Sequence, residues 1–227
     1  MQRITPVVLN LIVINVIAFL VQQLFSAFNV TDWGALHYFG SPDFKPHQLI
    51  THMFLHGGIS HIFFNLFTLF MFGTMLENYI GSKKFLLFYM ICGLGAGLLT
   101  QLSIPYSAEI FAKSADGLAI AQERNWTIAQ VIEQYKYEYQ MIGASGAIMG
   151  VMAAFAYLFP NTEMFIMFIP IPVKAKYVIP VFILIDLFGG INPSAGDNVG
   201  HFAHLGGALV GFLLMYFWNK KNRKTFY

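Results

Sequence analysis

The chain contains 227 residues, of which 57% are hydrophobic and only 11% are charged. Soluble domains are about 45–50% apolar and about 25% charged, so this chain has too little polar surface to form a soluble globule, and the same numbers exclude intrinsic disorder. The net charge of +2 comes without a basic, aromatic-containing patch that would indicate nucleic-acid binding, and the single cysteine, Cys92, allows neither a disulfide framework nor a CxxC metal site within one chain.

Long apolar runs predict six membrane-spanning helices. Each run is continuous, unlike the alternating strands of a β-barrel, and a helical span needs roughly 20 mostly apolar residues. The predicted spans are residues 7–27, 59–78, 84–103, 141–159, 177–189 and 200–218, with long connections over 28–58 and 104–140. The first span lacks a small-residue cleavage site, so we expect it to be retained. We predict an all-α, polytopic membrane protein with a single domain, residues 1–227, whose fifth span is interrupted by Pro170, Pro172 and Pro180.

The distribution of basic residues predicts the orientation, because cytoplasmic loops of membrane proteins are enriched in Lys and Arg. With the N-terminus in the cytoplasm, nine basic residues lie inside: Arg3, Lys83, Lys84, Lys174, Lys176, Lys220, Lys221, Arg223 and Lys224. Four lie outside: Lys45, Lys113, Arg124 and Lys136. Most acidic residues, Asp197 among them, also fall outside. We therefore expect both termini to be cytoplasmic and both long connections to face outward.

Four polar residues within the spans are candidates for function, because polar groups at membrane depth are costly. They are His61 and Asn65 in the second span, Ser145 in the fourth and His204 in the sixth. All three spans run from outside to inside. At about 1.5 Å per residue, Asn65 lies roughly 9 Å below the start of its span, and Ser145 and His204 lie roughly 6 Å below theirs. His61 is one turn above Asn65 on the same face. The four side chains are thus predicted to share one level near the outer surface.

Small residues surround both the serine and the sixth-span histidine. Gly146 and Gly150 form one GxxxG face, and Gly207 and Gly211 form another. Such faces allow close packing of membrane helices. If the fourth and sixth spans pack through them, the serine and the histidine can reach hydrogen-bonding distance. Taken singly, each feature is more often a packing face, a serine bonded to its own backbone or a histidine joining two helices; the shared level favours function.

The chemistry of this set is that of an activated serine. A hydroxyl is a weak nucleophile until a base removes its proton, and the neutral imidazole of His204 can do so near pH 7. A tetrahedral oxyanion needs hydrogen-bond donors. The Ser145 backbone N–H, the Asn65 amide and the His61 imidazole are candidates for this role.

Four motifs, taken together and in this order, resemble those of the rhomboid intramembrane serine proteases. Residues 143–146 (GASG) resemble the GxSG nucleophile motif, and residues 203–211 resemble the AHxxGxxxG motif of the base-bearing helix. Residues 61–65 resemble the HxxxN motif that supports the oxyanion, and residues 73–81 match a structural GxxxExxxG stretch. The resemblance covers roughly residues 5–218.

The resemblance implies a six-helix bundle with a water-filled cavity open to the outside. Ser145 would be the nucleophile and His204 the general base and then acid, in a dyad without a carboxylate. Asn65 and His61 would stabilise the oxyanion, with His201 and Gly143 as auxiliary positions. Asp186, the only acidic residue well inside a span, is interpreted as a structural partner for a helix or loop donor. In keeping with a dyad, no acidic residue occurs near the outer level of the second, fourth or sixth span.

The resemblance also implies the partners. These are transmembrane protein substrates, unwound near the outer face, and the lipid bilayer; no nucleic acid, cofactor or metal is implied, and no particular oligomeric state is predicted. A compact six-span chain resembles the bacterial form of the family. We therefore expect a multi-pass protein of the plasma (inner) membrane whose active site opens to the extracytoplasmic side.

The sequence departs from the family pattern at three places. Residues 45–48 (KPHQ) stand where many members have a Trp-Arg pair, and Met149 stands where an aromatic residue often stacks on the histidine. The connection 104–140 is long and charged. We favour a solvated insertion there, with an amphipathic helix, a substrate-access element and a partner site as alternatives.

Two other functions fit part of the sequence. His52 and His56, spaced i and i+4 and followed by His61, suggest a metal or proton transporter. No carboxylate pathway crosses the midplane and no inverted repeat is visible, so we interpret His52 and His56 as ties between the first connection and the bundle. A non-proteolytic rhomboid-like protein that binds membrane clients is the other alternative, although such relatives typically lack the serine or the histidine.

Overall fold

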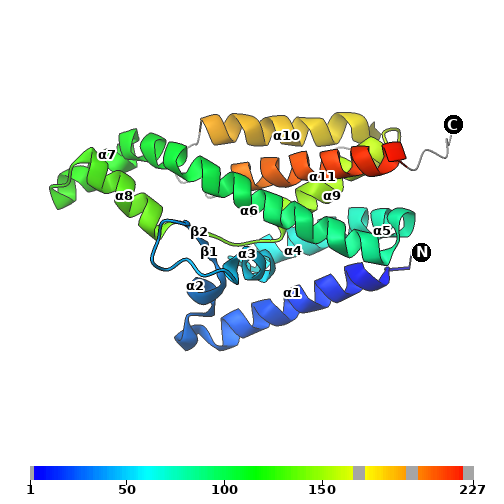
Figure 1. Ribbon diagram of the computed structural model, residues 1–227, viewed down its shortest axis with the longest axis horizontal. Coiled ribbons are helices and arrows are strands. Elements are labelled where there is room, and N and C mark those ends of the chain that lie inside the picture. The colour runs from blue at the N-terminus through cyan, green and yellow to red at the C-terminus, as the bar shows by residue number, and fades with distance from the viewer. Residues whose placement is uncertain (1–2, 166–171, 193–198, 222–227) are drawn as a thin grey trace.

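A computed structural model describes residues 3–165, 172–192 and 199–221 of the chain (Figure 1). The long helices run along one axis: α1 (Pro6–Leu24), α6 (Ser82–Lys113), α9 (Ser145–Leu158), α10 (Ala175–Ile191) and α11 (His201–Lys221). A further long element consists of α4 (Ile59–Thr68), a π-helical turn (Leu69–Gly73) and α5 (Thr74–Ile80). α9 and α11 make the most extensive contact, and α6 packs against both. α1 and α10 form opposite sides of the bundle in Figure 1.

The remaining elements belong to the connections. The first connection holds η1 (Ser26–Phe28), α2 (Val30–Gly34), β1 (Leu36–His37), α3 (Gln48–Thr51) and η2 (His52–Phe54). The second holds α7 (Ala115–Arg124), α8 (Ile128–Glu138) and β2 (Gln140–Met141). A hairpin of β3 (Glu163–Phe165) and β4 (Pro172–Lys174) precedes α10. The chain is therefore mostly helical, as predicted.

Four helical elements of the described chain are long and apolar enough to cross a membrane, so the protein is a multi-pass membrane protein. They are α1, the element Ile59–Ile80, α6 and α11. The other two predicted spans coincide with α9 and α10, which have 14 and 17 residues. α10 exposes Val181, Leu184 and Phe188 at helical spacing, at 53%, 60% and 70%. A stripe of this kind is typical of a helix that faces lipid. The count of six spans stays a prediction.

The start of the fourth predicted span is wrong by four residues. Residues 140–141 are extended, because β2 pairs with β1 in an antiparallel register that places Met141 opposite Leu36. α9 begins only at Ser145. The strand pairing joins the first connection to the segment that leads into α9 and so fixes where this helix begins.

The second connection is helical and packs against α6, although most of its residues are exposed, as expected of a solvated insertion. α6 continues ten residues beyond the predicted end at 103, and α7 and α8 pack back against it. Ala108 and Ala112 of α6 and Val131 of α8 are buried at this contact. Thr127 and Gln130 form a capping box that starts α8: the Gln130 N–H donates to the Thr127 Oγ1 over 3.3 Å, and the Thr127 N–H donates to the Gln130 side chain over 2.8 Å.

The core lies around α9, and glycine makes its packing possible. Every residue from Gly146 to Phe155 is buried. A Cβ on Gly207 would overlap the carbonyl oxygen of Gly146, and a Cβ on Gly211 would overlap that of Gly150. The two predicted GxxxG faces therefore do meet, and the backbones of α9 and α11 are in direct contact.

The GxxxExxxG stretch forms the join between α5, α6 and α1. The Glu77 carboxylate accepts hydrogen bonds from the backbone N–H groups of Val7 and Val8, at 3.0 and 2.9 Å, and from Ser82 Oγ at 2.6 Å. It thus caps the first turn of α1, where N–H groups lack helical partners. Gly81 links α5 to α6 in one residue with φ = 84°, a conformation that favours glycine.

Three of the charged residues used to predict the orientation lie outside the described residues: Asp197, Arg223 and Lys224. Pro170, expected to interrupt the fifth span, also lies outside them, whereas α10 continues through Pro180. Figure 1 shows the N-terminal end of α1, α5 and the C-terminal end of α11 at one end of the bundle, with α7 and α8 at the other. The start of α1 and the end of α11 thus share one side, as the predicted topology requires.

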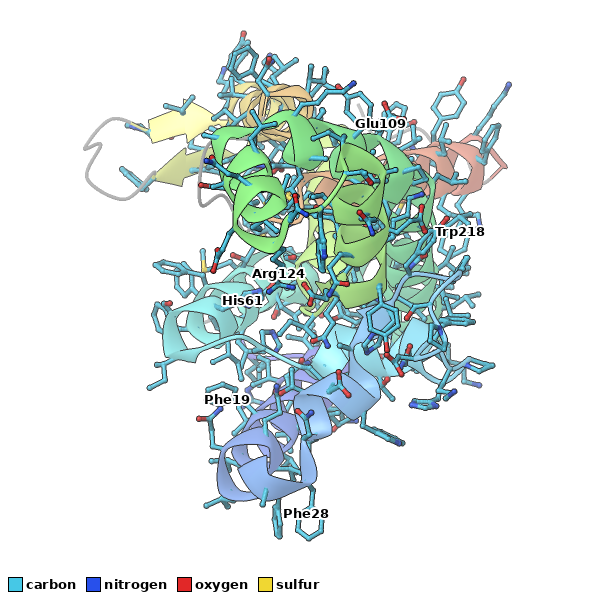
Figure 2. All side chains as sticks on the ribbon, turned by 90° about the vertical axis from the view of Figure 1, so that its left-hand side faces the viewer. Phe19, Phe28, His61, Glu109, Arg124 and Trp218 are labelled. Carbon is cyan, nitrogen blue, oxygen red and sulfur yellow. The ribbon has the colours of Figure 1, made fainter. Side chains whose placement is uncertain are left out.

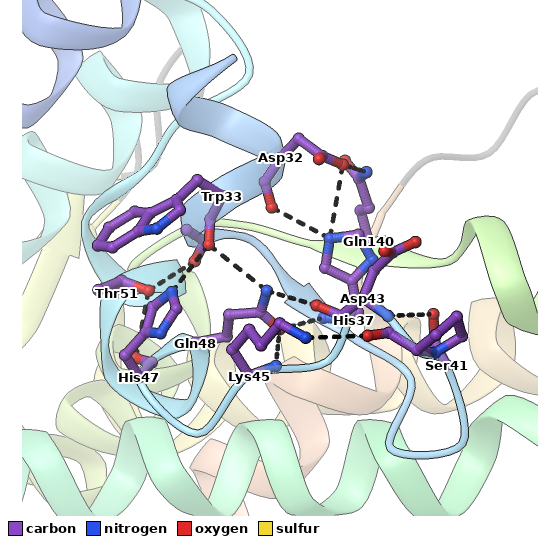
Figure 3. A network of polar contacts seen from close by, with 12 residues as sticks. Asp32, Trp33, His37, Ser41, Asp43, Lys45, His47, Gln48, Thr51 and Gln140 are labelled. Carbon is purple, nitrogen blue, oxygen red and sulfur yellow. Dashed lines mark hydrogen bonds and ion pairs between the residues drawn. The ribbon is translucent and has the colours of Figure 1, made fainter. Parts of the chain in front are cut away.

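Polar contacts order the first connection where the Trp-Arg pair is missing (Figure 3). The Gln48 side chain accepts from the Lys45 N–H at 3.1 Å and donates to the Asp43 carbonyl at 3.0 Å. The His47 ring stacks on Trp33, with ring centroids 4.3 Å apart, and its Nε2 lies 3.0 Å from the Trp33 carbonyl oxygen. A glutamine and a histidine thus hold this connection together.

Candidate active site

The entry into α9 depends on Gly143. Its φ of 127° lies in a region that side chains rarely adopt, and a Cβ there would lie 2.9 Å from the His61 Nε2. Its N–H donates to the His52 carbonyl oxygen over 2.9 Å. Gly143 therefore turns the chain out of β2, so that Ser145 becomes the first residue of α9, rather than lying four residues inside a span.

Ser145 and His204 are in contact. His204 lies in the first turn of α11, and its Nε2 is 2.9 Å from the Ser145 Oγ. Their helices are held together by the glycine contacts that begin one residue after Ser145 and three residues after His204. The predicted approach of these two side chains is therefore present, at the level where both helices begin.

The expectation that no carboxylate lies at this level is wrong. The Oδ1 of Asp186 lies 3.0 Å from the Nδ1 of His204 and 2.8 Å from the Nδ1 of His201. Asp186 is interpreted correctly as a partner of helix donors, but one of those donors is the His204 ring itself. α10 runs opposite to α9 and α11, so its C-terminal end reaches the level where they begin. Asp186 lies five residues before that end at Ile191, about 7.5 Å at helical rise. Counted from the C-terminal end of the fifth span, this distance places Asp186 near the outer level, so the sequence does contain a signal for its position.

His61 and Asn65 line the same pocket as Ser145 and His204. This pocket has a volume of about 390 Å³, and Met149 is also in its wall. The His61 Nδ1 accepts a hydrogen bond from the Gly57 N–H over 3.3 Å. In a neutral ring the other nitrogen, Nε2, then carries the proton, and it faces Gly143 beside the serine. The Asn65 amide donates to the His61 carbonyl oxygen over 2.8 Å and keeps a second N–H.

A larger cavity of about 890 Å³ lies between the start of α4, the ends of α6 and α10, the start of α11, and α7 and α8. Its walls include His61, His201, Asp116, Arg124 and Glu138. Figure 2 looks onto this end of the molecule, with His61 and Arg124 near the centre of the view. His61 belongs to the walls of both cavities, so the larger one lies next to the pocket of the serine.

His52 and His56 tie the first connection to neighbouring elements. The His52 ring nitrogen Nδ1 donates to the Gln48 carbonyl oxygen over 2.7 Å, and the His56 backbone N–H donates to the Gln22 side chain of α1 over 3.0 Å. Burial lowers the pKa of each ring to about 4, and the neighbouring His61 adds to the shift for His56. Within the described part of the chain, no three His, Cys, Asp or Glu side chains are grouped to hold a metal ion.

Comparison with known proteins points the same way as the geometry. The family model described as the Rhomboid domain matches residues 43–221. The rhomboid protease AarA of Providencia stuartii is 32% identical over 71% of this chain, and the rhomboid protease GluP of Bacillus subtilis is 30% identical over 73%. A RHOMBOID-like protein 6, named mitochondrial, of Arabidopsis thaliana is 29% identical over 74%.

These alignments cover only part of each relative. They span 52% of the Providencia protein, 24% of the Bacillus protein and 42% of the Arabidopsis protein. The family model, in contrast, covers most of this chain, including the elements that carry His61, Ser145, Asp186 and His204. By this match the chain belongs to the rhomboid family of membrane proteins.

Proposed function

We propose that this protein is an intramembrane serine endopeptidase that cleaves membrane-spanning segments of other proteins. The observation that carries the proposal is the 2.9 Å contact between Ser145 Oγ and His204 Nε2, made by two helices whose backbones are in direct contact. The names of the Providencia and Bacillus relatives, both rhomboid proteases, support it.

In the proposed reaction, Ser145 Oγ attacks the scissile carbonyl carbon while its proton moves to the Nε2 of His204. The tetrahedral intermediate collapses as the same nitrogen returns the proton to the departing amine. Water then repeats the sequence on the ester at Ser145. The proton of the serine, and later that of the water, is taken up by the same nitrogen, His204 Nε2. This nitrogen lies at hydrogen-bonding distance from Ser145 Oγ.

Three groups around the serine are proposed to stabilise the oxyanion. The Ser145 N–H is in the first turn of α9, where amides have no partner within the helix. The His61 Nε2 faces Gly143 and carries a proton in the tautomer that its bond from Gly57 selects. The Asn65 amide lines the same pocket. Donors fixed before the reaction lower its barrier most, because they need no rearrangement as charge develops.

The 890 Å³ cavity is proposed as the chamber that receives the part of the substrate outside the membrane. Its lining combines apolar side chains with charges of both signs, Asp116 and Arg124 on α7 and Glu138 on α8, and it reaches His61. A peptide that leaves the bilayer beside α9 would have its next residues in this chamber. The connection 104–140 is then a substrate-access element.

The proposal includes the six-span topology, with both termini cytoplasmic and the chamber on the extracytoplasmic side. It also includes the plasma membrane as the location, although the names of some relatives place those proteins in mitochondria or chloroplasts. The reaction itself depends only on a bilayer that brings a membrane-spanning substrate to α9.

The test is labelling by a fluorophosphonate probe and cleavage of a model transmembrane substrate in proteoliposomes. We expect the unaltered protein to be labelled and to cleave, and Ser145→Ala and His204→Ala to lose cleavage. Ser41→Ala is the matched control for the serine, because Ser41 lies in the first connection, away from the pocket. This control should cleave normally.

The two alternatives give other results. A client-binding protein without protease activity would retain the substrate without cutting it, and Ser145→Ala would change nothing. A transporter would be neither labelled nor cleave, and would move ions across the vesicle membrane. Cleavage that persists in purified Ser145→Ala would overturn the proposal.

A further inference from the structure

The carboxylate of Asp186 is bonded to two imidazole rings through one oxygen. His204 Nδ1 lies 3.0 Å from Oδ1 and His201 Nδ1 lies 2.8 Å from it. The three side chains are largely enclosed, with exposures of 11% for Asp186, 12% for His201 and 18% for His204. Water screens charges only weakly in an enclosed site. The attraction between the Asp186 carboxylate and a protonated His204 ring is therefore stronger there than at an exposed surface.

We propose that Asp186 is a positioning residue for the reaction of Ser145, which holds the His204 ring of the Ser–His dyad in its working orientation. The inference rests on the proposed function and deepens it. An ionised carboxylate can only accept a hydrogen bond, so the facing Nδ1 of His204 carries a proton. The other nitrogen, Nε2, is then the one with a free lone pair, and it is the one that faces Ser145 Oγ.

The carboxylate acts at the two moments when the proton moves. Before attack it holds the His204 ring in the orientation and tautomer that can accept the serine proton. After attack His204 carries a positive charge, and Asp186 faces it as a fixed negative charge. Asp186 itself neither gains nor loses a proton, and it touches neither the substrate nor the serine. Its effect passes through His204.

His201 restricts the carboxylate in turn. Its Nδ1 donates to the same Oδ1, so the rotation of the Asp186 carboxylate is opposed by two bonds from successive turns of α11. His201 was predicted as an auxiliary position beside the oxyanion. Its contact with Asp186 gives that auxiliary role a physical form, the support of the residue that orients His204.

A purely structural role is the competing explanation, because Asp186 also joins α10 to α11. The two explanations differ in what each variant should do. Asp186→Asn keeps the shape but loses the charge, and its amide N–H can donate to Nδ1 and select the wrong tautomer. His201→Gln weakens the link between α10 and α11 but leaves the bond from Asp186 to His204.

The experiment compares the two variants in proteoliposomes with a transmembrane substrate, separating kcat from KM. In triad proteases the corresponding change of aspartate to asparagine lowers kcat by about 10⁴. We expect Asp186→Asn to lower kcat by at least about 100-fold with KM within about threefold, and His201→Gln to lower kcat by less than about tenfold. Asp186→Ala should be partly rescued by added formate, which replaces the missing carboxylate without restoring a covalent link between helices.

Folding is checked by the elution volume and melting temperature of each variant. If Asp186→Asn does not fold, Asp186→Ala decides: recovery of cleavage with formate supports the inference, and no recovery overturns it. A kcat for folded Asp186→Asn within about threefold of the unaltered protein would overturn the inference. So would equal losses in Asp186→Asn and His201→Gln without formate rescue, because a helix link alone explains that result. Ser145→Ala keeps the two proposals separate. If it is inactive while Asp186→Asn is active, only the positioning role of Asp186 is wrong; if it is active, the serine protease proposal is wrong.

Discussion

Gly207 on α11 lies against the main-chain carbonyl of Gly146 on α9 so closely that no side chain fits between them. The same contact recurs one turn on, between Gly211 and Gly150. Because Ser145 and His204 lie in the first turns of these two helices, the separation of the backbones sets the distance between the hydroxyl and the imidazole. The packing of α9 against α11 therefore also positions the two side chains of the proposed reaction.

The first prediction follows from this contact. Gly207→Ala places a methyl group on the Gly146 carbonyl, so α9 and α11 must move apart. Overpacking of a tight core typically costs about 1–3 kcal/mol, and we expect a loss of unfolding free energy in this range together with reduced cleavage by the folded protein. Gly58→Ala is the stability control, since a Cβ there has no neighbour within 4 Å. Equal melting temperatures for Gly207→Ala and the unaltered protein would contradict the packing.

The sequence predicted the Ser145–His204 approach but not Asp186, and the reason is physical. GxxxG faces and shared depth are local features of two spans that run in the same direction. Asp186 reaches the site from α10, which runs the other way, so its depth has to be counted from the end of its span. Counting only from span starts left it out, and led to the expectation of a dyad without a carboxylate.

The second prediction concerns the capping carboxylate of Glu77. In Glu77→Gln, one acceptor oxygen becomes an NH₂ that faces a donor, the N–H of Val7 or Val8 or the hydroxyl of Ser82. Leaving a buried donor unsatisfied costs about 1–3 kcal/mol, so we expect this loss in unfolding free energy with kcat unchanged. Ser82→Ala removes one donor only and should lose less. Unfolding in mild detergent measures both.

Part of the fold could not be read from local patterns. The late start of α9 depends on the pairing of β1 with β2, more than 100 residues apart in sequence, which hydrophobicity alone does not reveal. The helices of the second connection could have been predicted from local sequence. The Thr127–Gln130 capping box predicts the start of α8, and the charge of this segment fits the exposure of most of its residues.

The third prediction tests the chamber. Arg124 lines it from α7, whereas Glu109, on the outside of α6, is exposed and is not among the residues that line it. Arg124→Ala should raise KM about fivefold, equal to about 1 kcal/mol of binding, for a substrate with its outer juxtamembrane segment. kcat should not change, because binding would be lost equally in the ground and transition states. Removal of that segment from the substrate should abolish the difference. Glu109→Gln serves as the control. A KM that is the same for both variants would show that the chamber does not bind substrate.

The fourth prediction is a pH dependence of stability. His52 and His56 have pKa values of about 4 in the folded protein because they are buried, against about 6.5 when unfolded. The unfolded chain therefore binds protons between these values that the folded chain does not. Their contribution to stability is complete above pH 6.5. It falls by about 1.4 kcal/mol per pH unit for each ring as the pH drops towards 4.

Unfolding free energies measured from pH 7.5 to pH 4.5 check this dependence. His56→Phe removes one titrating ring and keeps the ring packing on His61, whose centroid lies 5.0 Å away. In this variant the unfolding free energy should fall less steeply with decreasing pH, by the contribution of one titrating ring. An identical slope in His56→Phe would show that His56 is already protonated in the folded state, or is exposed to water.

The last prediction concerns orientation. Glu123 on α7 and Lys220 at the end of α11 are both exposed, and the proposed topology puts them on opposite sides of the membrane. Glu123→Cys should react with an impermeant maleimide on intact cells, and Lys220→Cys only after lysis. Native Cys92 is fully buried and gives the unlabelled background. Labelling of Lys220→Cys alone from outside would reverse the topology. It would place the Ser145 pocket at the cytoplasmic face, because that pocket lies at the start of α9 and α11, at the end of the bundle where α7 and α8 lie.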